Sequence, residues 1–93
     1  MQINRSSNYL SELFDILEYI ARDKISASIN FKENLDKQID NLVVFPYKYR
    51  KSIYFKDKNI RDMTFKGYTI VYRVKPRKEE IEILRIFNMN KPR

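Results

Sequence analysis

"YTIVYRVK", residues 68–75, is the stretch that decides the fold class of this chain of 93 residues. Its side chains alternate between two faces, as they do in a β-strand. One face carries Tyr68, Ile70, Tyr72 and Val74, and the other carries Thr69, Val71, Arg73 and Lys75. The only glycine of the chain, Gly67, stands directly before it. We therefore predict a strand with one apolar face that follows a turn.

Further strands are expected on both sides of this one. Residues 76–78 read as a polar turn, and residues 80–87 alternate again, with Ile81, Ile83, Arg85 and Phe87 on a shared face. Upstream, we predict a strand over residues 52–56, a polar turn at 57–59 and a short strand over 60–65. Short strands joined by short turns indicate an antiparallel sheet from residue 52 to residue 87.

The first half of the chain has a helical period instead. Ser7 is a candidate cap for a first helix. The apolar residues of that helix recur every three or four positions, at Leu10, Leu13, Phe14, Leu17, Ile20 and Ala21. A second stripe begins at Ile29 or Phe31 and continues through Leu35, Ile39, Leu42 and Val43. It should end before Pro46, because a proline disfavours helix at the residue that precedes it.

The two halves together predict the architecture. The connection between the helices is short, so they should form an antiparallel hairpin. A helical half followed by a strand half indicates an α+β fold, with two N-terminal antiparallel helices packed on a small antiparallel sheet. A length of 93 residues fits one domain, which we place over residues 1–93.

The composition argues against several classes of function. The chain contains neither cysteine nor histidine, so we expect no disulfide framework, no thiolate chemistry, no zinc site and no histidine base. One glycine cannot build a glycine-rich phosphate loop, and we expect no cofactor. The first residues lack the apolar run of a signal peptide, and the longest aliphatic-aromatic run, 42–45, cannot span a bilayer. We expect a cytoplasmic protein without a membrane partner.

The charge is distributed unevenly. Residues 1–45 carry five Lys/Arg and seven Asp/Glu, whereas residues 46–93 carry fourteen and five. The basic half begins with "FPYKYRKSIYF", residues 45–55, where cations stand between aromatic rings. Such a pattern suits a nucleic acid, the ribosome or an acidic protein partner, and equally a basic solvated surface. The candidate residues for binding a target or a nucleic acid are Lys48, Arg50, Lys51, Lys56, Arg73 and Arg85.

Several of these residues also have an ordinary structural interpretation. Tyr68 and Tyr72 lie among aliphatic residues of a strand, which favours a place in the core, and we expect the same of Phe45, Ile53 and Phe55. Arg61 and Asp62 are neighbours that could form an ion pair. Arg85 lies within an apolar strand, so it is either part of a structural ion pair or part of a functional surface.

Nearly the whole chain resembles the RelE/ParE family of bacterial toxins. The resemblance rests on "YIARD" at the end of the first helix, on "FP" and an arginine after the second, and on "IRDMTFKGYTIVYRV" and "IEILRIF" in the strands. It implies a helical hairpin on a twisted antiparallel sheet. It also implies a toxin of a type II toxin–antitoxin module, with roles in growth inhibition and plasmid stabilisation, whose partner is a cognate antitoxin in a hetero-oligomer.

The resemblance leaves two mechanisms open. ParE-like members act on DNA gyrase by binding, and "VYRV" and "ILRIF" are more similar to that branch. RelE-like members cut mRNA on the ribosome with basic residues, but the matching positions here hold Ile60, Asp62 and Thr69. If the chain is a ribonuclease, the candidate catalytic residues are Arg61, Arg73, Arg85 and Lys91. Because cleavage needs positive charge at the scissile phosphate, these departures favour binding over cleavage.

Overall fold

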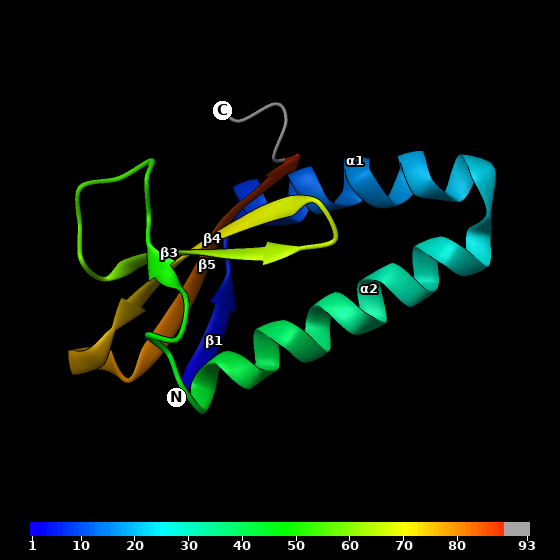
Figure 1. Cartoon of the computed structure of the whole chain (residues 1–93). Helices are drawn as coiled ribbons and strands as arrows, with labels where there is room; N and C mark the ends of the chain where they lie inside the picture. Colours follow the sequence, from blue (N-terminus) through cyan, green and yellow to red (C-terminus); the bar gives the residue numbers. More distant parts are fainter. Residues whose placement is uncertain (89–93) are drawn as a thin grey trace.

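The computed structural model describes residues 1–88 and confirms the α+β fold (Figure 1). Two helices, α1 (Ser7–Asp23) and α2 (Ile25–Asp40), form an antiparallel hairpin, and a short 3₁₀ turn (Asn41–Val43) ends it. The strands are β1 (Gln2–Arg5), β2 (Arg50–Lys51), β3 (Ile60–Phe65), β4 (Tyr68–Lys75) and β5 (Glu80–Asn88). They form one sheet in the order β1-β5-β4-β3-β2.

The sheet is mixed, whereas the sequence predicted an antiparallel one. Strands β2 to β5 pair antiparallel as expected, but β1 pairs parallel with β5, with Gln2 opposite Glu80 and Arg5 opposite Ile83. Strand β1 was not predicted, because "QINR" has a single apolar residue. That residue, Ile3, packs against the core from the edge of the sheet.

The predicted strand over residues 52–56 is wrong. Only two residues, Arg50 and Lys51, pair with β3, opposite Asp62 and Arg61. Residues 52–59 form a loop, which we call the 52–59 loop. Its apolar residues Ile53 and Phe55 are 66% and 42% exposed, and so are not core residues. Phe45 is 68% exposed and was also wrongly placed in the core.

Helix α2 buries the stripe that its apolar spacing predicted, whereas α1 is rotated so that only Leu13, Leu17 and Ile20 of its predicted stripe pack on the core. Helix α1 buries Tyr9 and Leu13, whereas Leu10 and Phe14 are largely exposed. Its cap is Ser6, one residue before the predicted Ser7, since the Ser6 hydroxyl accepts from the Tyr9 amide at 3.1 Å. Helix α2 buries Phe31, Leu35 and Ile39, which belong to the second predicted stripe.

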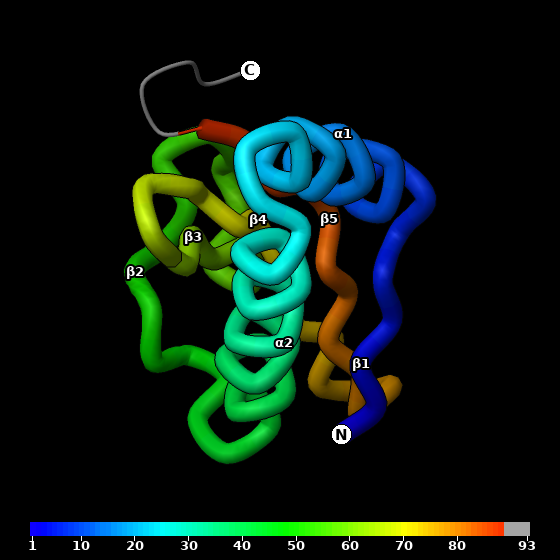
Figure 2. Tube along the Cα trace, turned by 90° about the vertical axis from the view of Figure 1, so that its right-hand side faces the viewer, coloured from blue at the N-terminus to red at the C-terminus, as the bar shows by residue number. Residues whose placement is uncertain are grey.

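The core lies between the helical hairpin and the sheet. Its strand residues include Tyr72, which is fully buried, and Tyr68, which packs against the cluster, so both tyrosines have the predicted core position. A smaller apolar cluster on the outer face of the sheet contains Ile60, Val71 and Phe87. The protein therefore has two layers, the helical hairpin and the sheet (Figure 2). A smaller apolar patch lies on the far side of the sheet.

A β-bulge in β5 explains why Phe87 lies on the outer face. Val71 pairs with Arg85, but the next residue, Tyr72, pairs with Ile83, so Leu84 is an extra residue in β5. After this insertion Ile86, rather than Phe87, follows Ile81 and Ile83 on the helix side. The predicted shared face therefore holds only up to Ile83. Within residues 1–88, no helix is both long and apolar enough for a membrane span.

Candidate functional site

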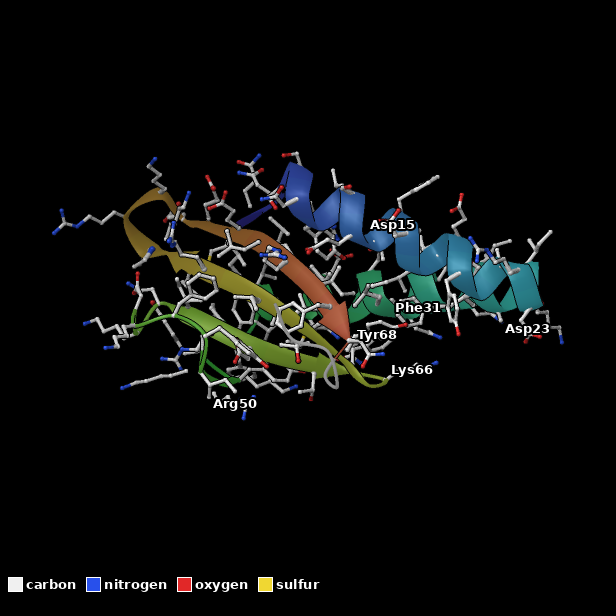
Figure 3. All side chains as sticks on the ribbon, turned by 90° about the horizontal axis from the view of Figure 1, so that it is seen from above. Asp15, Asp23, Phe31, Arg50, Lys66 and Tyr68 are labelled. Atoms are coloured by element: carbon white, nitrogen blue, oxygen red, sulfur yellow. The ribbon has the colours of Figure 1, made fainter. Side chains whose placement is uncertain are left out.

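The predicted cations between residues 45 and 61 gather at the β2 edge of the sheet. Figure 3 shows Arg50 there, on the side of the sheet away from Asp15 of α1. A further exposed cation, Lys58, belongs to the same region and was not among the predicted residues. We call this set the basic edge; its members are all exposed and are Lys48, Arg50, Lys51, Lys56 and Lys58.

Arg61 holds the backbone of the basic edge by hydrogen bonds. Its Nε donates to the Lys58 carbonyl at 3.0 Å, and its Nη1 donates to the Tyr49 carbonyl at 3.0 Å. The guanidinium carbon also lies 4.8 Å from the centroid of the Tyr47 ring. The predicted ion pair between Arg61 and Asp62 is therefore wrong. Arg61 holds together two segments that carry the exposed cations.

Asp62 is a second internal support. Its side chain has no exposed surface, and its Oδ2 accepts from the Ile53 amide at 3.0 Å. The same oxygen lies 3.7 Å from Nη2 of Arg50. A buried carboxylate is costly unless it accepts hydrogen bonds or pairs with a cation. The Oδ2 of Asp62 does both, whereas its Oδ1 is buried and has no hydrogen-bond partner among residues 1–88. Asp62 holds the start of the 52–59 loop against β3 and lies near the guanidinium of Arg50.

Tyr72, a core residue, holds the beginning of the basic segment at Pro46. Its hydroxyl donates to the Pro46 carbonyl at 2.6 Å. Burial raises the pKa of Tyr72 to about 12, so the hydroxyl stays protonated and able to donate. Next to this contact, residues 44–48 line an open groove of about 460 Å³. The exposed ring of Phe45 and the side chain of Lys48 both line this groove. The groove therefore combines an apolar surface with a positive charge.

The 52–59 loop covers the outer face of the sheet. The ring of Tyr54 packs edge-on against Phe87, with 5.2 Å between centroids. The Val74 amide donates to the Asn59 carbonyl at 2.8 Å, which fastens the end of the loop to β4. Arg73, a predicted site residue, is half-buried in β4 between Ile60 of β3 and Glu82 of β5, so that β3 separates it from β2. Its Nε has no hydrogen-bond partner among residues 1–88.

Arg85 is separate from the basic edge. Its Nε lies 2.9 Å from both carboxylate oxygens of Glu12 on α1, and the same carboxylate accepts from the Ile86 amide at 3.1 Å. The hydrogen bonds to Glu12 raise the pKa of Arg85. Of the two interpretations of Arg85, the structural ion pair is the one observed. Lys91, the last predicted site residue, lies outside the described residues.

The geometry of the basic edge suits binding. Exposed ammonium and guanidinium groups next to Phe45 and Tyr47 can attract a polyanion or an acidic segment with apolar side chains. The carboxylates within this region are exposed Asp57 and buried Asp62. Within residues 1–88, no three His, Cys, Asp or Glu side chains are grouped so that they could hold a metal ion.

The fold is that of small bacterial toxins. It is similar to a structure described as the chromosomal ParDE toxin–antitoxin system from P. aeruginosa, with a TM-score of 0.74, 19% identity and 95% of each chain covered. It is also similar to the isolated E. coli RelE toxin, with a TM-score of 0.67, 15% identity, and 98% of this chain and 86% of that one covered. At these identities the likeness concerns the fold alone.

The family of the chain follows from its sequence. Residues 3–91 match the family described as the ParE toxin of the type II toxin–antitoxin system, parDE. The chain therefore belongs to the ParE toxin family. No curated protein sequence matches it significantly.

Proposed function

We propose that this ParE-type toxin inhibits growth by binding a core cytoplasmic target such as DNA gyrase, without catalysing a reaction, and that the basic edge is the surface that binds. The observation that carries the proposal is the way the basic edge is built. Three side chains form internal contacts that hold residues 46–53 in place, namely those of Arg61, Asp62 and Tyr72. The neighbouring cations remain exposed. A surface held in place before binding loses less entropy when a partner docks.

A cognate antitoxin is the second partner in this proposal. The basic edge and the groove at residues 44–48 together offer exposed cations and exposed apolar side chains, including Val44 and Phe45. An acidic amphipathic segment complements both features and can order itself on such a surface. An antitoxin that covers the basic edge would neutralise the toxin by competing with its target.

Cleavage of mRNA on the ribosome is the alternative function. The orphan Nε of Arg73 favours it, because a half-buried guanidinium with an unused donor can contact a phosphate. Against it, Ile60, Asp62 and Thr69 occupy the positions where RelE-like members carry basic residues, and all three are buried here. A phosphate could reach these positions only if the 52–59 loop moved, because this loop donates a hydrogen bond to Asp62 and packs on the outer face of the sheet.

Two assays with the same purified protein test the choice. Gyrase supercoiling is measured beside primer extension on an mRNA that is translated in vitro. We expect loss of supercoiling with intact mRNA. Cuts spaced by codons, which appear only with ribosomes and vanish in Arg73→Ala, would instead establish the ribonuclease. Pull-down with the antitoxin encoded beside it tests the partner, and no stable complex at micromolar concentration would count against it.

A further inference from the structure

Two buried polar atoms on adjacent strands have no hydrogen-bond partner within residues 1–88. One is Oδ1 of Asp62 in β3, which is an acceptor, and the other is Nε of Arg73 in β4, which is a donor. A buried donor or acceptor without a partner is destabilising, so each one in a folded protein requires an explanation. A complementary pair on neighbouring strands points to a second arrangement in which the two side chains satisfy each other.

The two side chains lie on the same face of the sheet. In the register of β3 and β4, Asp62 is opposite Val71. Arg73 is opposite Ile60 in the same register. Val71 and Ile60 both belong to the apolar cluster on the outer face, and opposed residues of antiparallel strands share a face. Asp62 and Arg73 are therefore diagonal neighbours, a separation that a side chain as long as arginine can bridge.

Arg73 has no competing partner within residues 1–88. Its side chain forms no hydrogen bond or ion pair with any of them. The acid opposite it on β5 is Glu82, whose Oε1 lies 3.1 Å from Nζ of Lys75. That carboxylate already has a cation, whereas Oδ1 of Asp62 is buried and unused.

The 52–59 loop holds Asp62 in the arrangement observed. The Ile53 amide donates to Oδ2 of Asp62 at 3.0 Å. Tyr54, the next residue, packs its ring on Phe87 of β5, so the loop crosses the outer face of the sheet. If Asp62 turned to Arg73, the Ile53 amide would lose its acceptor and the start of the loop would be released. The amide could then donate to water, since Ile53 is exposed.

We propose that Asp62 is a conformational switch that opens and closes the 52–59 loop. In the closed position, which is the one observed, Asp62 accepts from the Ile53 amide. In the open position it pairs with Arg73, and the loop leaves the outer face. Opening gives both unpartnered atoms a partner but loses the packing of the loop on the sheet, so a gain offsets a loss. It also releases Arg50 from Asp62 to the basic edge. The switch does not depend on which target the toxin binds, so it stands apart from the proposed function.

Hydrogen exchange of the Ile53 amide in the full-length chain tests the switch. The exchange rate of this amide rises with the population of the open loop. Arg73→Met removes the partner of the open position, while the closed position loses no hydrogen bond. We therefore expect exchange to slow by about three- to fivefold, as for a partly exposed ion pair. Arg73→Lys keeps a cation that can reach Asp62 and should exchange like the wild type. Arg77→Met, the same change at an exposed arginine, is the matched control and should leave the rate unchanged.

A double variant tests whether Asp62 and Arg73 act together. Asp62→Ala removes both the closed and the open contact of this side chain, so adding Arg73→Met should have no further effect on exchange at Ile53. A second measurement uses the absence of tryptophan from the chain. Tyr54→Trp places a single tryptophan where the ring packs on Phe87, and acrylamide should quench it less when Arg73→Met is added. Exchange at the amides of β4 and β5 reports global unfolding and shows that each variant is folded.

The opposite sign of the effect would overturn the proposal. If Arg73 merely supported the closed loop, Arg73→Met would make exchange at Ile53 faster, and if it had no role the rate would be unchanged. A slowing that persists in the Asp62→Ala background would also overturn it, since Arg73 would then act without Asp62. Unchanged quenching of the tryptophan at position 54 would count in the same way.

Discussion

Arg85 and Lys48 show how differently two cations of one chain are used. Lys48 is exposed at the rim of a groove, whereas Arg85 is half-buried against Glu12, which is 73 positions away in the chain. The exposed position of Lys48 was predictable from its polar, aromatic segment. The partner of Arg85 was not, because nothing local links residue 85 to residue 12. For the same reason the internal role of Asp62 was missed, since its partner is the backbone of a loop.

The contact between Glu12 and Arg85 should contribute to stability. Replacing Glu12 with alanine leaves the guanidinium and the Ile86 amide without their acceptor, so we expect a loss of about 1–2 kcal/mol in the free energy of unfolding. Glu18→Ala on the same helix is the matched control and should change stability by less than about 0.5 kcal/mol. Urea unfolding of both variants decides this. If Glu12→Ala were as stable as Glu18→Ala, the contact between Glu12 and Arg85 would make no net contribution to stability.

The buried tyrosine Tyr72 should make stability depend on alkaline pH. Burial raises its pKa from 10.0 in the unfolded chain to about 12, so the folded state favours the neutral phenol. This contribution is fully present below pH 10 and is lost as the pH rises through 12. Unfolding measured from pH 9 to pH 12 should show a decline that is shallower in Tyr72→Phe. A decline of the same steepness in the variant would contradict the assignment.

At the scale of the elements, the sequence predicted what periodicity encodes. Both helices and the strands β3, β4 and β5 follow from apolar spacing. Strand β1 and the bulge at Leu84 do not, because β1 is polar and depends on pairing with β5, and the bulge depends on how β4 meets β5. Residues 52–56 of the 52–59 loop were mistaken for a strand because Ile53, Tyr54 and Phe55 are residue types that favour strands. Only two residues before it actually pair.

The start of the 52–59 loop should depend on the carboxylate of Asp62. Without the carboxylate of Asp62 the Ile53 amide loses its acceptor, so Asp62→Ala should loosen the loop while the helices and central strands stay folded. We expect faster amide exchange at Ile53 and faster proteolysis between residues 52 and 59, by about tenfold for the loss of a bond worth about 1.4 kcal/mol. Lys56→Ala, within the same loop, serves as the control. Unchanged exchange at Ile53 in Asp62→Ala would refute the role of this contact.

On the scale of the whole molecule, charge and fold divide the chain in the same way. The helical hairpin belongs to the acidic half of the chain, whereas the basic edge belongs to the basic half. The charge asymmetry was visible in the sequence. Which cations would stand together was not, because that depends on the loop that brings Lys56 and Lys58 beside β2.

The central claim is that the basic edge binds the target of this toxin, and inhibition of gyrase supercoiling by matched triple variants tests it most directly. Lys48→Ala/Arg50→Ala/Lys51→Ala removes three cations of the basic edge. Arg22→Ala/Lys24→Ala/Lys37→Ala removes the same charge from the helical hairpin. We predict that the first variant needs at least about tenfold more protein for half inhibition, while the second stays close to the wild type. Equal potency of the two variants, or an equal loss in both, would contradict the claim.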